Sequence, residues 1–190
     1  YSDETHSFVL SRTNAALLDC ALFLWSHKVK FVLNSGKEML APIFELLDHN
    51  LDLRDDKLFK ASLKDWYDTE FAKAEKAGAL AYADRVTDIM EMLHAASKYA
   101  QPVQLRGLLA EILVENKSGV LLSTVHKVKG LEADRVFLLE QSFPQRNAWR
   151  DQDKSRFVTQ EEYNLEYVAI TRAREHLIWV DLAVREQPEH

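Results

Sequence analysis

The first fifty residues switch between short apolar runs and apolar stripes at helical spacing. Phe8 to Leu10 is typical of a buried strand, and Val29 to Leu33 predicts a second strand. Between them, apolar residues three and four apart indicate a helix with Asn14 as its N-cap. Another helix is predicted from about Lys37 to His49. This strand–helix–strand–helix order is typical of a parallel sheet.

The pattern becomes purely helical from Leu51 to about Lys117. This stretch is charged, rich in alanine and almost free of glycine, and its apolar residues recur at helical spacing. Breaks are expected near Gly78 and Pro102, so we predict three or four helices. The interpretation is an all-helical insertion, residues 51–118, within one α/β domain made of residues 1–50 and 119–190.

Strand signals return after the insertion. Further strands are predicted at Val120 to Val125, Arg135 to Leu139 and His176 to Leu182. The polar region from Phe143 to Arg156 predicts an exposed loop. Thr159 and Glu162 have the spacing of a capping box, which predicts a helix that continues to about Arg174. The fold class is therefore α/β, a parallel sheet flanked by helices.

Composition and charge bear on the kinds of partner and site that this protein could have. The 190 residues are 47% hydrophobic, enough for a core, and no apolar run approaches the roughly 20 residues of a membrane span. We expect no membrane partner and a cytoplasmic protein. The lone Cys20 lies in an apolar stretch and predicts a buried, inert thiol, and the seven histidines lack metal-ligand spacing, so no metal site is expected. A net charge of −6 argues weakly against a protein that coats nucleic acid, but a protein that touches few phosphates need not be basic, so the charge decides little.

Two runs carry the chemistry. From Leu122 to Glu132 an apolar strand opens into a short basic turn closed by Gly130. From Tyr167 onward a predicted helix delivers Arg172 and Arg174 at its C-terminal end. A planar guanidinium can neutralise two oxygens of a phosphoryl group in transfer. The alternative is that both arginines only complement the negative end of the helix dipole.

Together these runs resemble motifs V and VI of the UvrD/Rep-like superfamily 1 DNA helicases, and Ser11 to Asn14 resembles motif IV. The resemblance covers residues 7–50 and 119–182. It implies the second RecA-like domain of an ATP-driven motor that moves on single-stranded DNA, 3′ to 5′, in DNA repair. The helical segment 51–118 stands where that family inserts its accessory domain, here in a reduced form.

The resemblance also implies roles for particular residues. Arg172 and Arg12 would converge on the γ-phosphate, Gly130 and Glu132 would contact the nucleotide, and Thr124 and His126 would bind the DNA backbone. Gly36 to Glu38 is similar to the segment after motif IV, where a glycine turn leads into a helix that bears an acid. One departure is Ser11, which stands where the family often has a tyrosine stacked on adenine.

Other aromatic and basic residues have weaker claims. Trp66, Tyr67 and Trp149 could stack on bases, although aromatic residues in such segments are more often part of a core. Arginines and lysines between residues 146 and 156 could touch phosphates, but Asp151 and Asp153 dilute their charge, which favours a solvated loop.

Two expected parts of such a motor are missing from the sequence. None of its five glycines supplies a Gly-x-x-x-x-Gly-Lys-Ser/Thr phosphate loop, and no Asp-Glu pair follows an apolar strand. Both belong to the family's first RecA-like domain. We therefore expect the C-terminal part of a longer protein, whose N-terminal domain binds ATP with Mg²⁺ and supplies the metal ligands. This chain alone should be inactive. Rival hypotheses are a non-catalytic DNA- or protein-binding module and the helicase arm of a helicase–nuclease.

Overall fold

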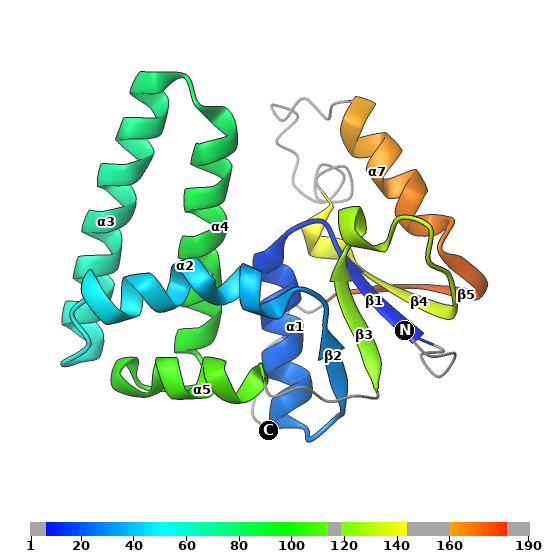
Figure 1. Ribbon diagram of the computed structural model, residues 1–190, viewed down its shortest axis with the longest axis horizontal. Helices are drawn as coiled ribbons and strands as arrows, with labels where there is room; N and C mark the ends of the chain where they lie inside the picture. Colours follow the sequence, from blue (N-terminus) through cyan, green and yellow to red (C-terminus); the bar gives the residue numbers. More distant parts are fainter. Residues whose placement is uncertain (1–6, 114–118, 144–159, 182–190) are drawn as a thin grey trace, which may run out of the picture.

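A parallel sheet forms the centre of the molecule. The computed structural model describes residues 7–113, 119–143 and 160–181. Within this part of the chain the strands are β1 (Ser7–Ser11), β2 (Phe31–Leu33), β3 (Val120–Thr124), β4 (Ala133–Leu139) and β5 (Ala173–Val180). They lie in the order β2-β3-β1-β4-β5, and all pairings are parallel (Figure 1). The predicted α/β class with a parallel sheet is confirmed.

Each face of the sheet packs into a separate apolar cluster. Alternate residues of one strand point to opposite faces, so Val9 belongs to one cluster while Phe8 and Leu10 belong to the other. Helices α1 (Asn14–Ser26) and α2 (Gly36–His49) cover the first face. The second face is covered by α7 (Gln160–Ile170) and by the short helix η2 (Val125–Val128). This double covering explains why the central strands are continuous apolar runs.

The start of α1 differs from the prediction by one residue. Thr13, not Asn14, is the N-cap: its backbone is extended and its hydroxyl accepts a hydrogen bond from the Ala16 N–H at 3.4 Å. Asn14 is the first helical residue, and its side-chain amide donates instead to Asp88 at 2.8 Å. Both side chains are good caps in isolation. A partner that is distant in the sequence decides between them.

The segment predicted as an insertion, residues 51–118, is helical where the structure describes it, and the predicted breaks at Gly78 and Pro102 are confirmed. It consists of α3 (Asp56–Ala77), α4 (Leu80–Ser97), the short helix η1 (Pro102–Gln104) and α5 (Leu105–Ile112). Helices α3 and α4 form an antiparallel pair beside α1 (Figure 1). Buried residues of the insertion, among them Phe59, Leu93 and Leu109, belong to the same apolar cluster as α1 and α2. The insertion and the α/β part therefore share one continuous core.

The end of α7 corrects a predicted boundary. The helix stops at Ile170 instead of continuing to about Arg174, and β5 begins at Ala173, three residues before the predicted start of the last strand. The Ala133 N–H donates to the Arg172 carbonyl at 3.0 Å, and Ala133 pairs with Ala173 in the sheet. Pairing with β4 thus overrides the local helical preference of this segment.

Other expectations concern individual residues and segments. Cys20 is buried, as predicted, and burial raises the pKa of its thiol to about 12. Within residues 7–113, 119–143 and 160–181, no helix is long and apolar enough to cross a membrane. The same residues contain no cluster of histidine, cysteine and acidic side chains that could hold a metal ion. Most of the predicted loop, and Thr159 of the capping box, lie outside the described residues.

Two glycines allow a direct test of the packing near the sheet. Gly119, just before β3, has φ +138°, and an added Cβ would lie 2.4 Å from the Lys30 carbonyl oxygen. We expect Gly119→Ala to lower the free energy of unfolding by about 2 kcal/mol or more, because both the clash and the backbone conformation oppose it.

Gly107→Ala is the matched control. Gly107 lies within α5 and has open space around its Cβ position, so alanine there should raise the free energy of unfolding by about 0.5–1 kcal/mol. Chemical denaturation of both variants measures the difference. Equal effects at the two positions would contradict the packing described for β3.

Candidate functional site

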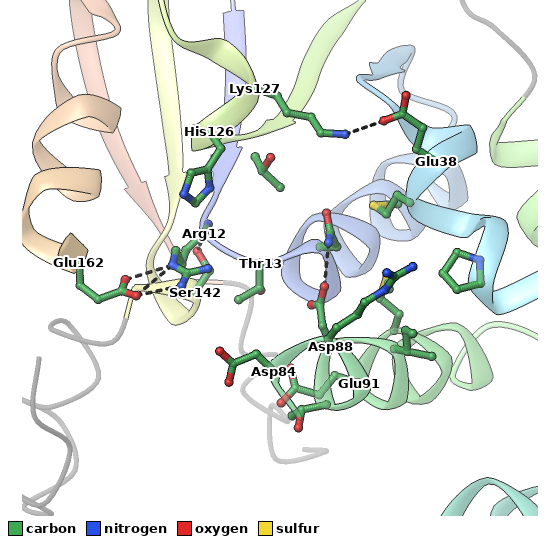
Figure 2. Close-up of a pocket in the computed structure, with 18 residues that line it drawn as sticks. Arg12, Thr13, Glu38, Asp84, Asp88, Glu91, His126, Lys127, Ser142 and Glu162 are labelled. Atoms are coloured by element: carbon green, nitrogen blue, oxygen red, sulfur yellow. Dashed lines mark hydrogen bonds and ion pairs between the residues drawn. The ribbon is translucent and has the colours of Figure 1, made fainter. Parts of the chain in front are cut away.

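A cavity of about 900 Å³ opens at the C-terminal edge of the sheet (Figure 2). The pairing of β1 with β3 creates it: Ser11 lies beside Thr124, so the residues that follow both strands meet at one edge. Arg12, Thr124 and His126 all line this cavity. The outer edge of parallel strands, past their carboxyl ends, is where ligands bind in open α/β sheets.

Arg12 is held in the cavity wall by Glu162, in the first turn of α7. Its Nε donates to both carboxylate oxygens at 3.1 Å, and its Nη2 donates to Oε1 at 2.9 Å (Figure 2). The Arg12 backbone N–H donates to Ser142 Oγ at 3.0 Å, which fixes the chain at the strand end. The hydrogen bond with Glu162 is the main cause of a raised pKa of Arg12, so the guanidinium stays charged.

The predicted DNA-binding residues line the same cavity. Thr124 ends β3 with its side chain almost buried, and its hydroxyl makes no hydrogen bond with the described part of the chain. His126 is exposed within η2 and points into the cavity (Figure 2). Beside it, Lys127 Nζ lies 3.1 Å from a carboxylate oxygen of Glu38, the acid of the helix that follows the Gly36 turn. A hydroxyl and an imidazole at one strand end are suitable donors for a backbone phosphate.

Helix α4 of the insertion forms the opposite wall. Asp88 accepts hydrogen bonds from the Ala15 N–H at 2.9 Å and from Asn14 at 2.8 Å. It therefore satisfies an N–H group at the start of α1 that has no partner within the helix. Asp84 and Glu91 lie on the same face of α4 and also line the cavity (Figure 2). These carboxylates offset the positive charge of Arg12 and Lys127.

The remaining predicted residues form a second group at the opposite edge of the sheet. Gly130 has φ +90° and open space at its Cβ position, which suits a close approach by a ligand. Glu132 directly precedes β4, and its carboxylate is 3.2 Å from Nε of Arg174. Arg172 follows α7 and directly precedes β5. Gly130, Glu132 and Arg172 thus lie near the N-terminal ends of β4 and β5.

Arg172 is engaged with the backbone in this structure. Its Nε donates to the Val168 carbonyl at 3.0 Å and its Nη1 to the Leu131 carbonyl at 3.1 Å, while Nη2 donates to Thr171 Oγ1 at 3.2 Å. Capping of the last carbonyls of a helix by arginine is a common structural role. The observed conformation is the one expected of a helix-end cation, and phosphate binding by Arg172 requires its side chain to turn away.

Arg12 and Arg172 lie apart in the structure, although the resemblance implies that they converge on the γ-phosphate. Arg12 contacts Glu162 in the first turn of α7, whereas Arg172 lies beyond Ile170 at the other end. At 1.5 Å per residue, the helix between Glu162 and Ile170 spans about 12 Å. Helix α7 runs antiparallel to the strands, so its two ends lie at opposite edges of the sheet.

Other residues considered from the sequence have structural partners. Ser11 is buried, and its hydroxyl donates to the Thr13 carbonyl at 2.8 Å, so this position faces the protein interior and not a base. Trp66 packs against the apolar core, and Tyr67 stacks on Phe71. Trp149 and the basic residues of the predicted loop lie outside the described residues.

Three residues shape the cavity although the sequence does not predict this for them: Asp88, Ser142 and Glu162, which pairs with Arg12. The sequence indicates Glu162 as the acid of a capping box and as part of the run that resembles motif VI, but not as the partner of Arg12. Asp88 and Ser142 carry no local signal, because their partners Ala15 and Arg12 are 73 and 130 residues away in the sequence. Only the folded chain reveals these contacts.

Comparison with known proteins gives a consistent result. Residues 54–181 match the profile of the UvrD-like helicase C-terminal domain. A 66-residue stretch is 44% identical to a probable DNA helicase of Mycoplasma pneumoniae (strain ATCC 29342 / M129 / Subtype 1), covering 33% of this chain and 12% of that relative. The matched profile includes the insertion and the segments that contain Thr124 and Arg172, but it begins after Arg12.

A substitution of Asp88 tests whether its hydrogen bonds to the start of α1 anchor α4. We expect Asp88→Ala to lower the free energy of unfolding by about 1–2 kcal/mol, because α1 loses a charged N-terminal partner. Asp65→Ala is the control: Asp65 is exposed on α3 and makes no hydrogen bond with the described part of the chain. Urea denaturation measures both variants, and similar stabilities would show that Asp88 does not anchor α4.

Proposed function

The chain belongs to the UvrD-like helicase C-terminal domain family, and on that premise we propose that it is the second motor domain of a longer ATP-dependent DNA helicase or translocase. One observation carries the proposal. Arg12 comes from the end of β1, Thr124 and His126 come from the end of β3, and all three line one cavity at the carboxyl ends of the strands. A charged donor and neutral donors gathered there suit phosphate groups.

The nucleotide would lie between this domain and the N-terminal RecA-like domain of the same protein. On this side Arg12 would bind a phosphate oxygen, and Gly130 would permit close backbone approach. Glu132 would accept a hydrogen bond from the ribose, for which it would have to leave Arg174. Magnesium ligands and the phosphate loop would come from the N-terminal domain. Bound ATP would supply the free energy that opens and closes the cleft between the domains.

Single-stranded DNA would run past Thr124 and His126. Thr124 ends β3 and His126 lies in the short helix that follows it, so a movement of the sheet relative to the N-terminal domain moves both as a unit. The exposed imidazole and the free hydroxyl offer donors to the DNA backbone without reading its sequence. This arrangement suits a motor that must accept any base, and by resemblance the movement would be 3′ to 5′.

A second candidate function is a non-catalytic module that keeps the helicase fold. The observation that favours it is the set of hydrogen bonds that ties Arg172 to the Val168 and Leu131 carbonyls. The buried Ser11 is consistent with it. Against it, a purely structural domain has no physical need for Arg12, Glu132 and Arg172 as a set.

The role of Arg172 separates the two functions. In the full-length protein, we expect Arg172→Ala to lower the kcat of single-stranded-DNA-stimulated ATP hydrolysis by about 10³- to 10⁵-fold, the range found for arginine fingers. ATP binding, followed with a fluorescent ATP analogue, should persist. Arg135→Ala is the control, because Arg135 is exposed on β4 and makes no hydrogen bond with the described residues.

Because Arg172 also ties α7 to the segment before β4, thermal melting must show that the variant folds. A folded Arg172→Ala protein with less than about a tenfold loss of kcat, against the much larger loss expected of an arginine finger, would identify Arg172 as a helix-end cation. The non-catalytic module would then be the better proposal.

The DNA side has a separate test. Thr124→Ala and His126→Ala should each raise the single-stranded DNA concentration for half-maximal ATPase stimulation by about 3- to 10-fold, the equivalent of one hydrogen bond. His49→Ala is the control, since His49 is exposed at the end of α2 and away from the cavity. Unchanged DNA dependence in both cavity variants would exclude this edge of the sheet as the DNA path.

A further inference from the structure

Arg12 uses only one edge of its guanidinium to bind Glu162. The contacts run from Nε and Nη2 to the carboxylate, at 2.9 to 3.1 Å. A guanidinium carries five N–H groups in a rigid fork. Nη1 makes no hydrogen bond with the described part of the chain, and the side chain lines the cavity. The Nη1–Nη2 edge therefore remains available to a second anion.

The pair is well placed to limit the motion of this arginine. The side chains of Arg12 and Glu162 are 33% and 16% exposed, so they lie at the boundary between protein and cavity. Glu162 belongs to a helix that packs on the sheet through Ala169 and Leu165, and Arg12 follows a central strand. Both partners thus start from rigid elements, which makes the orientation of the guanidinium reproducible.

We propose that Glu162 is a positioning residue for Arg12, holding its guanidinium so that the free edge faces an incoming nucleotide phosphate. The inference rests on the proposed function, in which Arg12 binds the phosphate. An arginine side chain has several rotatable bonds, and fixing them before the reaction avoids an entropic cost during it. The carboxylate and the phosphate occupy different edges of the guanidinium, so both can be bound together.

A different role for Glu162 predicts the opposite sign. If its carboxylate competed with phosphate for Arg12, removing the negative charge would strengthen ATP binding and lower KM. If Glu162 positions Arg12, removing the charge lowers kcat because the guanidinium is no longer held in one orientation. The direction of the change therefore decides between positioning and competition.

The experiment measures single-stranded-DNA-stimulated ATP hydrolysis by the full-length protein that carries this chain. We expect Glu162→Gln to lower kcat by about 10- to 100-fold, the scale of a small misplacement of a reacting group, without a lower KM for ATP. Glu162→Asp, which keeps the charge on a shorter side chain, should fall between Gln and wild type. Glu161→Gln is the control: it removes one charge from the same turn, from an exposed residue without a hydrogen bond to the described chain.

The same substitution in an Arg12→Ala protein shows whether the loss of kcat arises through Arg12 or from a general structural effect. If Glu162 acts through Arg12, Glu162→Gln causes no further loss of kcat in an Arg12→Ala protein. Equal losses in both backgrounds, a lower KM, or an unchanged kcat would each overturn the positioning role while the motor function stands. A wild-type protein without ATPase activity, or an Arg12→Ala protein with normal activity, would overturn the phosphate role of Arg12 and this inference with it.

Discussion

The parallel pairing of β1 with β3 on one side and β4 on the other is the constraint on which the site depends. It puts Ser11 beside Thr124 and thereby brings the chain after β1 and the chain after β3 to one edge. The pairing is stable because both faces of the sheet are covered by apolar clusters. Residues more than a hundred positions apart in the sequence can then share one cavity without any direct bond between them.

The predicted site residues form two groups, at opposite ends of the parallel strands, and helix α7 connects the two groups. Its first turn carries Glu162, which holds Arg12 at the cavity, and Arg172 follows its last turn, near Gly130 and Glu132. A ligand that contacts both groups has to extend along the helix, a distance of about 12 Å over eight residues.

The insertion is coupled to the site by contacts of two kinds. Its apolar residues complete the core over α1 and α2, and Asp88 accepts a hydrogen bond from an N–H group at the start of α1. The same helix, α4, brings Asp84 and Glu91 to the cavity. Apolar packing is non-directional, so the shared core holds the insertion against α1 and α2. Hydrogen bonds are directional, so those of Asp88 set the position of the insertion relative to the strand ends.

Hydrophobic spacing alone determined the class of fold and the helical character of segment 51–118. The physical reason is that burial imposes a period of 3.6 on helices and favours continuous apolar runs in a doubly covered sheet. The resemblance of short runs to helicase motifs IV, V and VI singled out Arg12, Thr124, His126, Gly130, Glu132 and Arg172. Only the tertiary structure decided how these residues group, since that depends on strand order and on the direction of α7. It also decided that Thr13 caps α1, that α7 ends at Ile170 and that Glu162 pairs with Arg12. In each case the deciding partner lies far away in the sequence, where local preference carries no information.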